Sequence, residues 1–225
     1  MFKRKLTTGE FALILVNLVS LYGVWFEGWD ARQVFLVYCL ETIIIGVFNV
    51  LKMAAVTIFV KPKEEWQNGS SNSLQSGWFF ILFFIMHYGI FVFVQTQIFF
   101  AVSGLVKDNS IFWKYAQIPA LLGRDGSLLL LIFVAYYLMQ TVYEFFIRGR
   151  YKTVSLGRLM FEPYGRIIIQ QFVVIIGSIF LTFGAGKMFI LIMVMVKIFF
   201  EVFFNFGRIL EQTGKKGTDN NTLAE

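Results

Sequence analysis

The sequence predicts an all-α fold, a polytopic membrane helix bundle of about six transmembrane helices with both termini cytoplasmic. The prediction rests on the composition, on six long apolar segments and on the distribution of Lys and Arg between them. Of 225 residues, 57% are hydrophobic, 15% are charged and 28 are phenylalanine. A soluble fold of this length could not cover so much apolar surface, whereas lipid accepts it. The bilayer is therefore the expected solvent.

Six apolar segments reach or approach the roughly 20 residues that a helix needs to cross a bilayer. They span 11–26, 34–60, 78–106, 128–147, 167–186 and 188–206. The first is short and follows basic residues, but no small-residue cleavage site comes after it, so we interpret it as a retained helix and not a signal peptide. The second and third are longer than a perpendicular crossing requires, so they must tilt, bend or protrude.

The segments between these helices differ in character. Residues 61–77 are polar and rich in Asn and Ser, which is typical of a mobile connector loop. Residues 107–127 mix aromatic and charged side chains, as expected of a segment at the membrane interface. Residues 148–166 are basic with apolar residues at helical spacing, which predicts a short amphipathic helix on the inner leaflet. We expect one transmembrane helical domain over 1–210 and a polar, disordered tail over 211–225.

The loop charges predict the orientation. With the N-terminus inside, thirteen Lys and Arg lie in cytoplasmic segments and five lie outside, which fits the positive-inside rule. The inside set is Lys3, Arg4, Lys5, Lys61, Lys63, Arg148, Arg150, Lys152, Arg158, Arg166, Arg208, Lys215 and Lys216; the outside set is Arg32, Lys107, Lys114, Arg124 and Lys187. We therefore expect a multi-pass protein of the cell (inner or plasma) membrane. Its net charge of +6 suits contact with anionic membrane lipids and requires no nucleic acid.

A carboxylate within an apolar segment is the most unusual feature of the sequence. Glu41 lies in segment 34–60. A charged side chain near the bilayer centre costs about 3 kcal/mol, and it persists only when it is paired, hydrated or required for function. Asn49 and Lys52 fall on the same helical face, because eleven residues make about three turns. Glu41 is either a carboxylate tied to a neighbouring helix or a functional group, and Lys52 is either an interfacial anchor or part of the same site.

Three further ionisable residues lie in later segments. His87 falls near the depth of Glu41, where it is either a hydrogen-bonded core residue or a proton switch that titrates near neutral pH. Lys197 and Glu201 are four residues apart and can pair along one helix face, for structure or for function. We expect Glu41 to contact Lys197 or His87 from another helix. The predicted transport or polar cluster is Glu41, Asn49, Lys52, His87, Lys197 and Glu201.

Three strings in the chain resemble a known family. They are Tyr38-x-x-Glu41-x-x-x-x-Gly46-x-x-Asn49-x-x-Lys52, His87-Tyr88-Gly89 and Pro163-Tyr164-x-Arg166-Ile167. They resemble an uncharacterised family of short prokaryotic six-helix integral-membrane proteins, a domain of unknown function, over most of the chain. The resemblance implies six helices and no activity. The family pattern includes a histidine near Gln170 or Gln171 that this chain lacks, which argues against a metal site.

The leading functional hypothesis is a small channel or transporter for an ion or small solute that passes the predicted cluster. The alternative is a non-transporting accessory protein whose buried charges hold the bundle together while it binds a partner, either a second copy or another membrane protein. A water-filled path through the cluster favours the first, and a closed, paired cluster favours the second. An intramembrane enzyme is less favoured, because no nucleophile with a base and no His-Glu zinc motif is present. We predict no cofactor and no metal.

Overall fold

The computed structural model describes residues 8–61, 64–68, 71–103 and 111–203, except for the side chains of some residues within these ranges. Six long helices correspond one by one to the six predicted segments: α1 (Thr8–Trp25), α2 (Ala31–Phe59), α3 (Gly77–Ser103), α5 (Ile118–Gln140), α7 (Tyr164–Thr182) and α8 (Gly186–Phe203). The prediction of a helix bundle is confirmed. Tail residues 211–225 lie outside the described part.

Three stretches of helix are long and apolar enough to cross a membrane, namely Ala31–Phe59, Gly77–Ala101 and Lys114–Ile147. A shorter apolar helix spans Gly9–Trp25. These lengths and compositions indicate a membrane protein, since about 20 apolar residues suffice for one crossing. The number of crossings and the side on which each terminus lies stay predictions.

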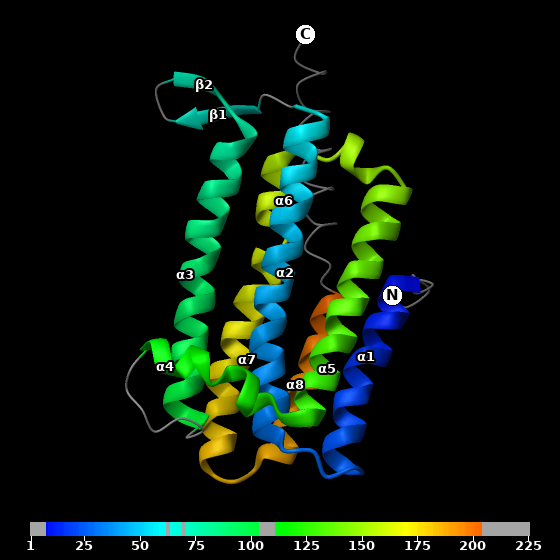
Figure 1. Ribbon diagram of the computed structural model, residues 1–225, viewed down its shortest axis with the longest axis vertical. Coiled ribbons are helices and arrows are strands. Elements are labelled where there is room, and N and C mark those ends of the chain that lie inside the picture. The colour runs from blue at the N-terminus through cyan, green and yellow to red at the C-terminus, as the bar shows by residue number, and fades with distance from the viewer. Residues whose placement is uncertain (1–7, 62–63, 69–70, 104–110, 204–225) are drawn as a thin grey trace.

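Helix α2 lies at the centre of the bundle, between α3 and α5 and in front of α7 and α8 (Figure 1). Its residues from Val34 to Thr42 form an unbroken buried run. A helix that is apolar on every side is stable only where neighbours or lipid surround it, and neighbouring helices bury this run of α2, whereas Val47 and Leu51 further along the helix are exposed. Helix α3, at one edge of the bundle, instead exposes large apolar side chains such as Trp78, Leu82 and Met86.

One end of the bundle carries a small β-hairpin, and we call it the hairpin end (Figure 1). Strands β1 (Glu64–Asn68) and β2 (Ser71–Gln75) are antiparallel, with Asn68 opposite Ser71. Residues 61–77 connect α2 to α3, as expected, but ten of them form this hairpin, which the expectation of a mobile loop did not include. The sequence did contain a signal for it, because Gly-Ser, the pair between Asn68 and Ser71, is typical of two-residue hairpin turns.

The predicted segment 128–147 is helical to its end, but its last seven residues are not α-helical. Helix α5 continues without a break as a π-helix, η1 (Thr141–Ile147), in which the Arg148 amide donates to the carbonyl oxygen of Tyr143 at 3.0 Å. A single turn, η2 (Arg150–Lys152), and the short helix α6 (Leu156–Phe161) come next. The Ser155 side chain accepts a hydrogen bond from the Arg158 amide and so caps the start of α6.

Helix α6 is amphipathic, as predicted, but its apolar side does not face the lipid. Leu156, Leu159 and Met160 are fully buried against α2 and α3. The expected amphipathic helix on the membrane surface is therefore part of the bundle core. Tertiary packing competes with lipid for the same apolar face, and here the neighbouring helices cover it.

Two glycines permit close approaches between helices. A Cβ atom at Gly46 of α2 would lie 2.6 Å from the ring of Tyr88 on α3, and one at Gly177 of α7 would lie 2.0 Å from the ring of Phe189 on α8. Neither contact is sterically allowed for a larger residue. The Tyr88 hydroxyl uses its close approach to donate to the Thr42 carbonyl oxygen at 2.9 Å.

Candidate functional site

The ion pair between Glu41 of α2 and Lys197 of α8 lies inside the bundle. The Lys197 Nζ atom donates to Oε2 of Glu41, and the two side chains are only 7% and 1% exposed. The two residues are 156 positions apart in the chain, so the fold alone brings them together. The expected contact between Glu41 and Lys197 is present in the structure.

Two aromatic rings and a hydroxyl also contact the pair. The Tyr137 hydroxyl, near the end of α5, donates to Oε1 of Glu41 at 2.6 Å, so both carboxylate oxygens are bonded. The Lys197 ammonium lies 4.5 Å from the ring centroid of Tyr38 and 4.8 Å from that of Phe133. Aromatic faces stabilise a cation, most strongly where water is excluded. The pair is therefore solvated by the bundle itself.

Arg166, in the first turns of α7, extends this group toward the hairpin end. Its Nη1 atom donates to the Tyr137 hydroxyl at 3.2 Å, and its guanidinium lies 5.9 Å from the Tyr137 ring centroid. Lys197, Glu41, Tyr137 and Arg166 thus form a bonded chain across four helices. We call these four residues the midbundle network. Such a network both stabilises the packing and offers a relay of polar groups through apolar surroundings.

On the side of α2 that faces α1, a second polar group holds Tyr38 in place. The Tyr38 hydroxyl is 2.5 Å from Oγ of Ser20 and donates to Oδ1 of Asn17 at 3.1 Å. Gln170 of α7 donates to the Tyr38 carbonyl oxygen at 2.7 Å. These contacts fix the ring on which the Lys197 ammonium rests.

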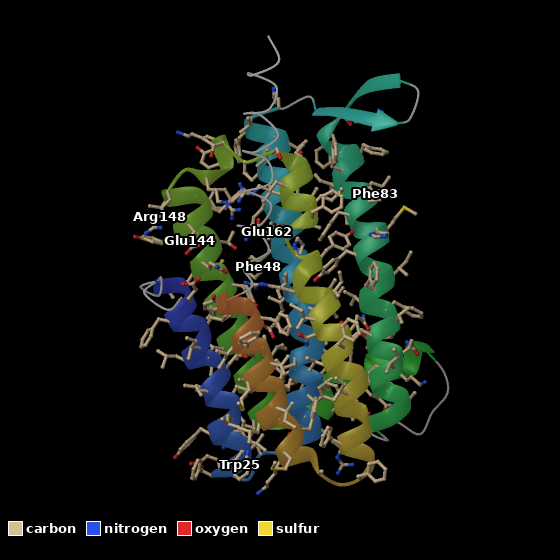
Figure 2. The ribbon with its side chains drawn as sticks, turned by 180° about the vertical axis from the view of Figure 1, so that it is seen from behind. Trp25, Phe48, Phe83, Glu144, Arg148 and Glu162 are labelled. Atoms are coloured by element: carbon tan, nitrogen blue, oxygen red, sulfur yellow. The ribbon has the colours of Figure 1, made fainter. Side chains whose placement is uncertain are left out.

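His87, expected near Glu41, is not joined to the midbundle network. Its side chain is exposed on α3, where it stacks on Phe83 with ring centroids 5.5 Å apart. Its Nδ1 atom is 2.7 Å from the Tyr164 hydroxyl of α7. Figure 2 labels the neighbouring Phe83 on α3, at the edge of the bundle. The expectation that His87 points into the bundle was wrong, because sequence depth does not fix the rotation of a helix.

Asn49 and Lys52 lie closer to the hairpin end than the ion pair and make different contacts from Glu41. The Asn49 Nδ2 atom donates to the Leu159 carbonyl oxygen at 2.9 Å, which ties α2 to α6. Lys52 is partly buried, with its ammonium 6.0 Å from the Phe145 ring centroid. Glu201 belongs to the last turn of α8, and its side chain lies outside the part that the structure describes.

A more exposed group of charges surrounds Glu162, next to α6. Arg150 donates to its two oxygens at 3.3 and 3.0 Å. Burial alone would raise the pKa of Glu162, but Arg150, Lys52 and Arg166 together hold it below its ordinary value. Glu144 of η1 and Glu162 lie at nearly the same height, closer to the hairpin end than Phe48 (Figure 2).

Sequence reasoning missed two members of the midbundle network. Tyr137 is one of several aromatic residues in an apolar helix, and no sequence signal distinguishes it. Arg166 stands in one of the strings that carry the family resemblance, although no role was assigned to it. Within the described residues, no three His, Cys, Asp or Glu side chains gather in a way that could hold a metal ion.

The fold and the buried ion pair define a class, a helical bundle of membrane type with an ionic interior. The chain belongs to a family of unknown function, DUF6498, whose model matches residues 1–218. This confirms the resemblance at the level of the family. No curated protein and no solved structure matches the chain.

Proposed function

We propose that the protein is a non-transporting membrane protein that binds a partner within the bilayer, with the midbundle network holding its helices in place. The observation that carries the proposal is that side chains of the bundle itself satisfy both members of the ion pair. Both oxygens of Glu41 accept hydrogen bonds from within the chain, and two rings cover the Lys197 ammonium. Charges that are satisfied in this way suit a structural role better than exchange with a passing ion.

The exposed His87 supports the partner-binding part of the proposal. An imidazole among apolar side chains on the outside of α3 is better satisfied by a polar group of another membrane helix than by lipid chains. The bond from Nδ1 to Tyr164 holds the ring in one orientation. A protein helix with a hydrogen-bonding side chain is thus the expected type of partner.

Transport is the second candidate, and one observation favours it. The bonded chain from Arg166 through Tyr137 and Glu41 to Lys197 leads from the hairpin end into the middle of the bundle. Titratable groups in such a row are the elements from which proton and ion pathways are built. The network would then change its pairing during each cycle.

Flux measurements separate the two candidates. Purified wild type, Glu41→Gln and the exposed control Glu27→Gln are reconstituted in liposomes, and ion and proton flux are recorded over a pH series. The accessory role predicts no flux for any of them and a lower melting temperature for Glu41→Gln alone. Flux in the wild type that Glu41→Gln abolishes, while the protein stays folded and monodisperse, would establish transport instead.

We also propose that six helices cross the membrane and that the hairpin end faces the cytoplasm. The charge asymmetry of the loops supports this orientation. Cysteine labelling in intact cells provides the test, since Cys39 is buried. An impermeant reagent is expected to label Asp108→Cys and not Ser71→Cys, and the reverse pattern would refute the topology.

A further inference from the structure

Three basic side chains from distant parts of the sequence converge on one carboxylate at the hairpin end. Lys52 comes from α2, Arg150 from η2 and Arg166 from α7, and the charge of each acts on Glu162. Arg166 belongs to the midbundle network as well, through its bond to the Tyr137 hydroxyl, and Arg148 and Lys152 of the same end are exposed. We call Lys52, Arg150 and Arg166 the basic triad. Because its three residues come from three separate elements, the basic triad exists only in the folded protein, as is usual for a binding site.

The charges of this region do not balance. The carboxylates that act on Lys52 are Glu162 and Glu144, whereas Arg150 and Arg166 repel it. Three positive charges therefore act together with two negative ones, and the Oε1 atom of Glu144 lies next to α1, 3.1 Å from where a Cβ atom added to Gly9 would stand. An additional negative charge would be attracted to this region, strongly so where water is scarce.

Lys52 is the member of the triad whose bonding is incomplete. Arg150 donates to Glu162 and Arg166 donates to Tyr137, but the Lys52 ammonium makes no hydrogen bond or ion pair with any residue that the structure describes. Its side chain is nevertheless partly buried, and its ammonium lies 6.0 Å from the ring centroid of Phe145. A partly buried ammonium with three unused donors is a binding group for an anion.

We propose that the basic triad, with Lys52 as its main binding group, holds a phosphate-type anion at the hairpin end. Phosphate oxygens accept several charge-assisted hydrogen bonds at once, which suits one ammonium and two guanidinium groups whose charges act on the same carboxylate. Two sources carry this chemistry, the headgroup of an anionic lipid and a soluble phosphate. The carboxylate of Glu162 competes with the anion, because it already accepts hydrogen bonds from both Nη atoms of Arg150.

The test uses the full-length protein in detergent and three probes: short-chain phosphatidic acid, short-chain phosphatidylcholine and inorganic phosphate. The melting temperature is followed against the concentration of each. Phosphatidic acid is expected to raise it saturably and phosphatidylcholine is not. An equal effect of inorganic phosphate identifies a soluble anion as the ligand, and an effect of phosphatidic acid alone identifies a lipid headgroup.

Three variants locate the site. Lys52→Gln is expected to raise the half-saturating concentration about tenfold. The matched control Lys152→Gln removes an exposed lysine of the same end and is expected to change it less than about twofold. Glu162→Gln removes the competing carboxylate and is expected to lower it, a gain of affinity that misfolding cannot imitate.

Some results would overturn the proposal. One is no saturable shift of the wild type with either phosphate-bearing probe. Another is an equal loss of affinity in Lys52→Gln and Lys152→Gln, which would indicate diffuse surface attraction. If Lys52→Gln does not fold, Lys52→Arg and Glu162→Gln decide: retained binding in the first with tighter binding in the second supports the site, and unchanged affinity in Glu162→Gln refutes it.

Discussion

Two ion pairs of this bundle contain the same kinds of charge in very different surroundings. Glu41 and Lys197 are 1% and 7% exposed and come from helices at opposite ends of the chain. Arg150 and Glu162 are 32% and 31% exposed and are only 12 residues apart. Water can replace either partner of the second pair but neither partner of the first. The comparison shows that burial, and not the presence of a salt bridge, decides how strongly a pair constrains the fold.

The largest effect is expected when one member of the buried pair is removed. Lys197→Gln removes the cation that donates to Oε2 of the buried Glu41, which is expected to cost about 3 to 5 kcal/mol of folding free energy. Thermal unfolding in detergent measures it. A loss below about 1 kcal/mol would mean that the pair is solvated in a way the structure does not show.

Removal of both charges is expected to be milder than removal of one. The double variant Glu41→Gln with Lys197→Met keeps the volume of both side chains and leaves no unpaired charge. We expect its melting temperature to lie between those of the wild type and the single variants Glu41→Gln and Lys197→Met, and we expect a coupling energy of about 2 kcal/mol in the cycle that these four proteins form. Additive losses would show that the two residues act separately.

Tyr137 gives an intermediate case, because it bonds the buried pair through its hydroxyl alone. Tyr137→Phe is expected to cost about 2 kcal/mol, the usual value for a hydrogen bond to a charged group. The control is Tyr143→Phe, whose exposed ring lies against Arg148. Its loss is expected to stay within about 0.5 kcal/mol. Equal losses in the two variants would contradict the role of the Tyr137 hydroxyl.

The exposed pair of Arg150 and Glu162 is expected to contribute less to the free energy of unfolding than the buried pair. Arg150→Gln should lower the free energy of unfolding by less than about 1 kcal/mol, since both partners remain hydrated. The same unfolding measurement used for Lys197→Gln provides the comparison. If the two single variants lose equal stability, the distinction between the buried and the exposed pair fails.

The smallest expected effect is a pH dependence from Glu162. Because the surrounding cations lower its pKa in the folded state, Glu162 stabilises the fold fully at pH values above its ordinary pKa of 4.5. This contribution is lost as the pH falls below that value and passes the folded pKa. Unfolding of wild type and Glu162→Gln between pH 7 and 3 measures it: their difference should shrink at the acid end, and a constant difference would refute the mechanism.

Much of the helical framework could be predicted from the sequence. Segment 34–60 corresponds to α2 at Ala31–Phe59, and the other five long helices overlap their apolar segments, although α5 begins at Ile118, ten residues before its segment. The π-helical end of α5 and the β-hairpin were missed, because both depend on a few local hydrogen bonds and not on the hydrophobic pattern. Residues 148–166 were recognised as amphipathic, but the sequence could not show that α2 and α3, and not the membrane surface, cover their apolar side.

The sequence by itself determined that the chain forms long apolar helices and that Glu41 needs a partner, since segment length and the cost of a buried charge are local properties. Only the tertiary structure decided that Lys197, Tyr137 and Arg166 supply the bonds while His87 lies outside. The reason is geometric. A helix places its side chains in every direction, and the rotation of each helix against its neighbours is fixed by packing of the whole bundle and not by the depth of a residue along its axis.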